Sequence, residues 1–257
     1  MFDQFLQERK YLLNCSPKTL RHYESAFRWY DPDPKCCVMK MREAGLRPVS
    51  CNSYITMLNA YLHWKGETFR IPKLKFEHPI PPTFSHADIS KIMKVMPISR
   101  VQVLLLTLAD TGLRLGEALG LTWDHVDMDG LMLRVMGKGR KERLVPFSTQ
   151  LRRFLFRVRK TGYVFQTASG LPLSQRNALR DAKQLCKQLS IVPPPRTMHA
   201  MRHGFALNFV RQGGSVFHLM RLLGHTTLTM SQRYVALTTA DLKEAHRSVL
   251  TSATCLT

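Results

Sequence analysis

The chain has 257 residues, enough for one large domain or two of ordinary size. Its apolar fraction of 44% and charged fraction of 22% are those of a folded globular protein and exclude a disordered chain. No apolar run approaches the roughly 20 residues that span a bilayer, and the polar stretch after Met1 is unlike a signal sequence. We therefore expect a cytoplasmic protein.

Positive charge is the strongest compositional feature. Lys and Arg number 38 against 18 Asp and Glu, a net charge of +20, of which residues 1–82 carry +5 and residues 83–257 carry +15. Such an excess attracts polyanions and favours phosphate contacts. A basic protein without a polyanionic partner, or one that sits on anionic lipid, is the alternative. The charge favours nucleic acid as the partner, which would place the protein at the nucleoid.

Six cysteines are scattered without C-x-x-C spacing, so neither a zinc site nor a disulfide framework is predicted. The vicinal pair Cys36–Cys37 is interpreted as small buried residues in a reducing compartment.

Residues 1–80 are predicted to form a bundle of about four helices. Apolar residues recur at helical spacing over 2–12 and 16–30, and the second segment opens with Ser16 as N-cap and Pro17 at the first helical position. Segments 34–45 and 49–66 each end in a glycine, as helices often do. Four prolines within 70–84 then indicate a linker.

We divide the chain near residue 80 and expect residues 81–257 to be mainly helical around one hairpin. Ser85 is a candidate N-cap, and the apolar run 101–108 predicts a buried helix that turns at Thr111–Gly112. Alternation predicts strands 131–136 and 142–147 around a Gly-Lys-Gly tip, and segment 238–250 predicts a final amphipathic helix. The predicted fold class is therefore mainly α with a small antiparallel β-sheet (α+β).

Several polar residues each have an ordinary explanation when taken singly. Arg114 sits between two leucines, where Glu117 three residues on could supply a helical ion pair. Lys138 at the hairpin tip could be a solvated charge, and its surroundings lack the P-loop spacing. His225 after Gly224 could be a helix cap, and Tyr234 could be a core side chain.

The segment "HAMRH" offers two interpretations. His199 and His203 stand at i, i+4, as in a zinc helix, but the glutamate of H-E-x-x-H is absent and no third ligand is evident. His199 and Arg202 stand three residues apart on one helix face, where an imidazole and a guanidinium can converge on an anion.

Together these residues suit phosphodiester exchange. That reaction needs a nucleophile that can carry a covalent phosphate, positive donors for the non-bridging oxygens, a proton acceptor and a proton donor. Arginine, histidine, lysine and tyrosine can fill these roles, and the sequence holds all four in its more basic part.

Four segments in order resemble the tyrosine recombinase (phage integrase) family: "TGLRLGEALGLTWDHVD", "VMGKGRKERLVPF", "HAMRHGFALNFVRQGG" and "LLGHTTLTMSQRYV". The resemblance covers about residues 85–240, and residues 1–80 resemble that family's helical core DNA-binding domain more loosely. It implies the catalytic set Arg114, Lys138, His199, Arg202, His225 and Tyr234.

The resemblance also implies how these residues act. Tyr234 would attack the scissile phosphate of double-stranded DNA and form a 3′-phosphotyrosyl link, without metal or nucleotide cofactor. Arg114, Arg202 and His225 would hold the non-bridging oxygens, His199 would assist deprotonation of Tyr234, and Lys138 would protonate the leaving 5′-oxygen. Strands would be exchanged through a Holliday junction by a homo-tetramer on DNA, with no small-molecule substrate. Glu117 would support Arg114.

Some points stay open at this stage. Leu207 stands where the family often has a smaller residue, which affects packing. The absence of a preceding arm-site domain favours an Xer-like or transposon-type recombinase. The final helix could dock on its own domain or into a neighbouring subunit. The alternatives are a type IB topoisomerase, which relaxes supercoils by the same chemistry, and a DNA-binding regulator with a decayed site.

Overall fold

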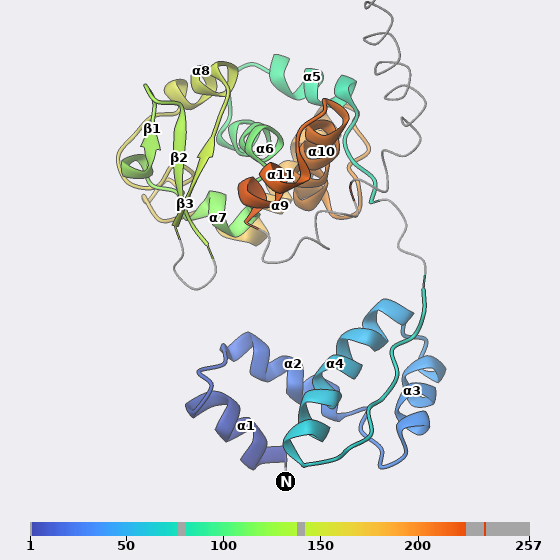
Figure 1. Cartoon of the computed structure of the whole chain (residues 1–257). Helices are drawn as coiled ribbons and strands as arrows, with labels where there is room; N and C mark the ends of the chain where they lie inside the picture. Colours follow the sequence, from blue (N-terminus) through green and yellow to red (C-terminus); the bar gives the residue numbers. More distant parts are fainter. Residues whose placement is uncertain (1, 77–80, 138–141, 225–233, 235–257) are drawn as a thin grey trace, which may run out of the picture. The chain divides into compact units, whose positions relative to one another are not determined.

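The computed structural model describes residues 2–76, 81–137, 142–224 and 234. The chain divides into two compact units, residues 1–79 and 80–257, each with its own apolar core (Figure 1). No helix among the described residues is long and apolar enough to cross a membrane. The predicted final helix, 238–250, lies outside the described residues.

Four helices form the first unit: α1 (Phe2–Tyr11), α2 (Pro17–Phe27), α3 (Pro34–Glu43) and α4 (Pro48–Trp64). The Ser16 side chain accepts a hydrogen bond from the Thr19 amide, which confirms the predicted N-cap. A cluster of rings joins α1, α2 and α4, with Phe5 and Tyr61 fully buried and in edge contact at 5.4 Å between centroids.

The first part of the predicted linker is fixed to α4. The Asn59 side chain bonds the amide and carbonyl of Ile71 at 2.8 and 3.0 Å. The Asn52 side chain does the same for Leu74, at 2.8 Å on each side. These pairs satisfy backbone groups of an extended segment that has no sheet neighbour. The described residues of 70–84 therefore contain no helix, as the prolines predict, and those up to Leu74 belong to the first unit.

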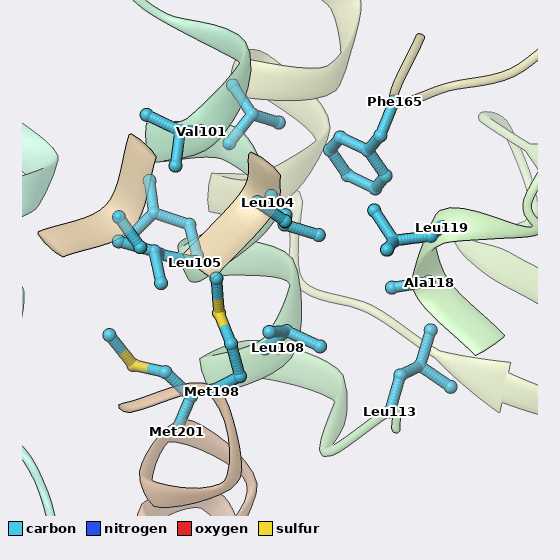
Figure 2. Packing of buried hydrophobic residues seen from close by; sticks show 14 of the residues in the cluster. Val101, Leu104, Leu105, Leu108, Leu113, Ala118, Leu119, Phe165, Met198 and Met201 are labelled. Atoms are coloured by element: carbon cyan, nitrogen blue, oxygen red, sulfur yellow. The ribbon is translucent and has the colours of Figure 1, made fainter. Parts of the chain in front are cut away.

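The second unit is built around α6 (Arg100–Thr111), whose residues 101–108 are all buried. Among the described helices, those that contact it are α7 (Leu115–Leu119), α5 (His86–Lys94), α8 (Thr149–Arg157), α9 (Gln175–Gln188) and α10 (Thr197–Arg211). Figure 2 shows the leucines of α6 between Met198 and Met201 of α10 and Ala118 and Leu119 of α7. Each fully buried leucine contributes roughly 1.5–3 kcal/mol to the free energy of folding. This packing holds helix α6 rigidly in place.

A three-stranded antiparallel sheet lies on one side of this unit, in the order β1 (Val126–Asp127), β2 (Met132–Met136) and β3 (Glu142–Pro146) (Figure 1). Strands β2 and β3 pair antiparallel, with Leu133 opposite Val145, which confirms the two predicted strands. Strand β1 follows a 3₁₀ turn, Trp123–His125, and was not predicted because two residues give no alternation. The last helix described is α11 (Val216–Leu223).

Candidate active site

The turn from α6 to α7 presents Arg114. Helix α6 ends at Gly112, whose φ of +64° is in the left-handed region. A Cβ on Gly112 would overlap the Phe205 ring and lie 2.8 Å from the Leu223 side chain, so this close approach requires glycine. Leu113 is fully buried, which leaves the next residue, Arg114, exposed at the start of α7.

Arg202 on α10 reaches the same turn from the other side. Its Nη1 donates to the carbonyl of Gly112 at 2.6 Å and its Nη2 to that of Leu223 at 2.8 Å. Only 7% of the residue is exposed, and burial lowers its pKa to about 10, with the charges of Arg114 and Arg143 acting in the same direction. Arg202 is therefore a desolvated cation at neutral pH, as suits an anion ligand.

Three arginines bind the end of α11. The carbonyl oxygens of residues 222–224 accept hydrogen bonds of 3.0, 2.8 and 3.2 Å from Arg143, Arg202 and Arg114, in that order. The last carbonyls of a helix lack intrahelical partners and form the negative end of its dipole. The helix end and the three guanidinium groups therefore hold one another in place, immediately before His225 in the chain.

Glu117 joins two of these arginines. Arg114 Nη1 donates to its Oε1 at 2.9 Å, and the Arg114 amide donates to Oε2 at 2.8 Å. Burial alone would raise the pKa of Glu117, but the hydrogen bonds from Arg143 and Arg114 outweigh it and hold that pKa below its ordinary value. Glu117 is therefore ionised. It links Arg114, its i, i+3 partner, to Arg143.

Tyr234 is 3% exposed and packs against Ala206, Leu207, Leu219 and Leu223. Its hydroxyl is nevertheless not enclosed by hydrocarbon, because the oxygen lies 2.6 Å from Nδ1 of His203. The residue next to His203 is Arg202, so the phenol and the buried guanidinium are held by neighbouring positions of α10.

His199 stands one helical turn before Arg202, at an exposed position of α10. Partial desolvation lowers its pKa, and the positive charges of Arg196 and Arg202 lower it further. The neutral imidazole is thus favoured near neutral pH, which is the form that accepts a proton.

The structure brings Arg114, Arg202 and Tyr234 together around the turn after α6 and the end of α11. It places His199 one helical turn before Arg202 on α10. Lys138 and His225 lie outside the described residues. Within the described residues, no group of three or more His, Cys, Asp or Glu side chains could hold a metal ion, so the zinc interpretation of His199 and His203 gains no third ligand there.

Two residues of the arrangement were missed by the sequence analysis. Arg143 stands two positions before buried Val145 on β3, so strand alternation places it on the inward face, where an arginine needs a partner. His203 was weighed only as a metal ligand, although it follows Arg202 directly. Both were visible as polar residues on buried faces, but their partners come from distant parts of the chain.

Comparison with known proteins identifies the family and the fold. The sequence model of the Phage integrase family matches residues 82–241. Along almost its whole length the chain is similar to tyrosine recombinase XerC of Lacticaseibacillus casei strain BL23, with 30% identity over 289 aligned positions and 95% of each chain covered. This chain belongs to the phage integrase family. It is a tyrosine recombinase, and the resemblance seen in its sequence motifs is confirmed.

Other tyrosine recombinases are similar at greater distance. XerA of Pyrococcus furiosus is 28% identical, over 80% of this chain and 76% of that one. The structure of the Tn1549 transposon integrase in complex with transposon right end DNA has a TM-score of 0.75 at 19% identity, covering 95% and 97% of the two chains. A crystal structure of XerA recombinase has a TM-score of 0.58 at 20% identity. These likenesses confirm the predicted fold class.

Proposed function

We propose that this tyrosine recombinase cuts and rejoins double-stranded DNA with Tyr234 as its nucleophile. The observation that carries this assignment is the meeting of two arginines at the end of α11, with the hydroxyl of Tyr234 bonded to the residue next to one of them. Two guanidinium groups at one point suit the two non-bridging oxygens of a phosphodiester.

Charge stabilisation falls to Arg114 and Arg202, with His225 as a third donor. Negative charge builds up on the non-bridging oxygens as the phenolic oxygen approaches phosphorus, and donors that are already fixed stabilise this charge without reorganising. The carbonyls of Leu223 and Gly224 hold the guanidinium groups of Arg202 and Arg114 before DNA arrives. The phosphate completes the coordination of these arginines.

Proton transfer uses different residues. Tyr234 attacks phosphorus as His199 accepts the hydroxyl proton, the bond from phosphorus to the 5′-oxygen breaks, and Lys138 donates a proton to that oxygen. The product is a 3′-phosphotyrosyl ester and a free 5′-hydroxyl. A 5′-hydroxyl of the partner strand then attacks the ester, restores a phosphodiester and releases Tyr234, so no nucleotide cofactor is consumed.

Access to the phosphate requires a change at Tyr234. Its hydroxyl is bonded to His203 and its ring is buried among Leu207, Leu219 and Leu223. We infer that DNA binding exchanges the contact with His203 for contact with the scissile phosphate.

We further propose that residues 1–80 form a helical DNA-binding domain and residues 81–257 the catalytic domain. A homo-tetramer on paired recombination sites would carry the reaction through a Holliday junction at the nucleoid, in the cytoplasm. The supporting features are the net charge of +20 and the DNA complexes of the Tn1549 integrase and of XerH.

Trapping on a nicked suicide substrate tests the nucleophile. Loss of the short nicked fragment prevents religation, so the wild-type chain should accumulate a covalent adduct. Tyr234→Phe should form no adduct while it still binds DNA. Tyr163→Phe, which removes another hydroxyl of the same unit, is the matched control and should form adduct normally. An adduct with Tyr234→Phe would show that the nucleophile is another residue.

A further inference from the structure

Arg143 occupies an unusual position for a charged residue of a hairpin. It lies on β3, and only 15% of its side chain is exposed, whereas Arg134 on the neighbouring strand is 58% exposed. Burying a guanidinium costs several kcal/mol unless it is fully paired. The hydrogen bonds of Arg143 therefore show which groups offset the cost of burying it.

The guanidinium of Arg143 binds two elements at once. Nη1 and Nη2 donate to Oε1 and Oε2 of Glu117 at 3.0 and 2.9 Å, a two-point pairing in which both planar groups are aligned. Nε donates to the carbonyl of Leu222 at 3.0 Å. A Cβ on Gly224 would lie 3.1 Å from this guanidinium, so the end of α11 is packed closely against it.

Arg143 thereby connects three parts of the candidate active site. Through Glu117 it reaches Arg114, because the same carboxylate binds both arginines. Through Leu222 it reaches the helix end that precedes His225. Its own strand, β3, pairs with β2, and in the sequence Lys138 stands between these two strands.

We propose that Arg143 is a positioning residue for strand cleavage, which sets Arg114 and the end of α11 relative to the base of the hairpin. It acts through Glu117 and Leu222 and does not contact the scissile phosphate. The planar fork of the side chain is the property that matters, because a lysine keeps the charge but cannot pair both carboxylate oxygens while also reaching a carbonyl. This inference rests on the proposed roles of Arg114, Lys138 and His225.

The test measures single-turnover cleavage of the suicide substrate at saturating DNA, with DNA affinity and the melting temperature measured in parallel. Displacing a reacting constellation by about 1 Å can cost on the order of 100-fold in rate. Arg143→Gln and Arg143→Lys should each lower the cleavage rate by roughly 10- to 100-fold, with affinity changed less than about threefold. Arg134→Gln, which breaks the exposed pair with Glu142, is the matched control and should keep the rate within about twofold.

A double-mutant cycle identifies the route of the effect. If Arg143 acts through the shared carboxylate, Glu117→Gln and Arg143→Gln together should cost much less than the product of their separate fold-losses. Should Arg143→Gln fail to fold, the cycle is run with Arg143→Lys.

Three outcomes would overturn the proposal. Wild-type rates with Arg143→Lys would show that only positive charge matters. A loss confined to DNA affinity would make Arg143 a DNA ligand, and multiplicative losses in the cycle would exclude action through Glu117. Failure of the proposed function is a separate result, because it appears as adduct formation by Tyr234→Phe in an otherwise wild-type chain.

Discussion

At the scale of single residues, the candidate site is a set of side chains that limit one another's protonation and position. Arg202 stays charged although it is buried, because its pKa falls only to about 10. Glu117 stays ionised because Arg143 and Arg114 outweigh its burial. The pKa of His199 is also lowered, by burial and by the charges of Arg196 and Arg202, and this favours its neutral form. A cation, an anion and a neutral base thus coexist around one helix end.

The lowered pKa of His199 predicts the acid side of the pH profile. Below this pKa the imidazole is protonated and cannot accept the proton of Tyr234, so the rate of adduct formation at limiting DNA should fall with decreasing pH. The midpoint should lie below the ordinary histidine value of 6.5. Rates measured from pH 5 to 8 check this, and His199→Gln should be slower and lack the limb. A midpoint above 6.5 would contradict the assignment.

The same shift has a consequence for stability. The unfolded chain has the higher pKa at His199, so between the two values it holds a proton that the folded chain lacks. The contribution of His199 to the free energy of unfolding should therefore decrease as pH falls through this window.

At the scale of helices and strands, short sequence signals predicted where helices begin. Contacts between distant parts of the chain determine how the candidate site is assembled. Ser16 and Ser85 cap helices because each interacts with residues three positions on, so their roles were readable from short segments. The contact from Arg114 to the carbonyl of Gly224 spans 110 residues, and no periodicity encodes it. The family motifs pointed to Arg114 and Arg202, whereas the partners of Arg143 and His203 became visible only when β3, α10 and α11 were placed together.

The turn between α6 and α7 should be sensitive to substitution. Gly112→Ala places a Cβ in the left-handed region and against the Phe205 ring, so it should lower the free energy of unfolding by about 2–5 kcal/mol. Gly213→Ala is the matched control: its φ is +82°, but nothing lies within 4 Å of the added atom, so its cost should be about 1–2 kcal/mol. Urea denaturation measures both. Equal losses would show that strain alone, without the close approach, makes this glycine necessary.

At the scale of the whole molecule, charge and segment composition could be read without the structure. The prolines of 70–84 predict a division near residue 80, and the chain forms two compact units, residues 1–79 and 80–257. What composition could not predict is that Ile71 and Leu74 are fixed to α4, because the amides of Asn52 and Asn59 bind backbone that has no sequence signature of its own.

The net charge of +20 predicts a steep salt dependence of DNA binding. Cations that neutralise phosphates release bound counterions, and a protein with 6–10 such contacts loses on the order of 10³- to 10⁵-fold in affinity between 50 and 200 mM salt. Fluorescence anisotropy with a fixed duplex, titrated across this range, measures the slope of log affinity against log salt. A flat slope would mean that the positive surface does not face the phosphate backbone.

The buried position of the Tyr234 side chain bears on whether DNA is cut at incorrect sites. If Tyr234 is the nucleophile, the packing of its ring against Leu219 and Leu223 and the contact of its oxygen with His203 would withhold it from duplex DNA that the recombinase binds non-specifically. Cleavage at a random sequence would then carry the free-energy cost of moving the ring out of its packing. Only a correct site would supply enough binding energy to offset that cost. Part of the enzyme's selectivity for its recombination site would in this way arise before any base is contacted, from the buried position of the Tyr234 side chain.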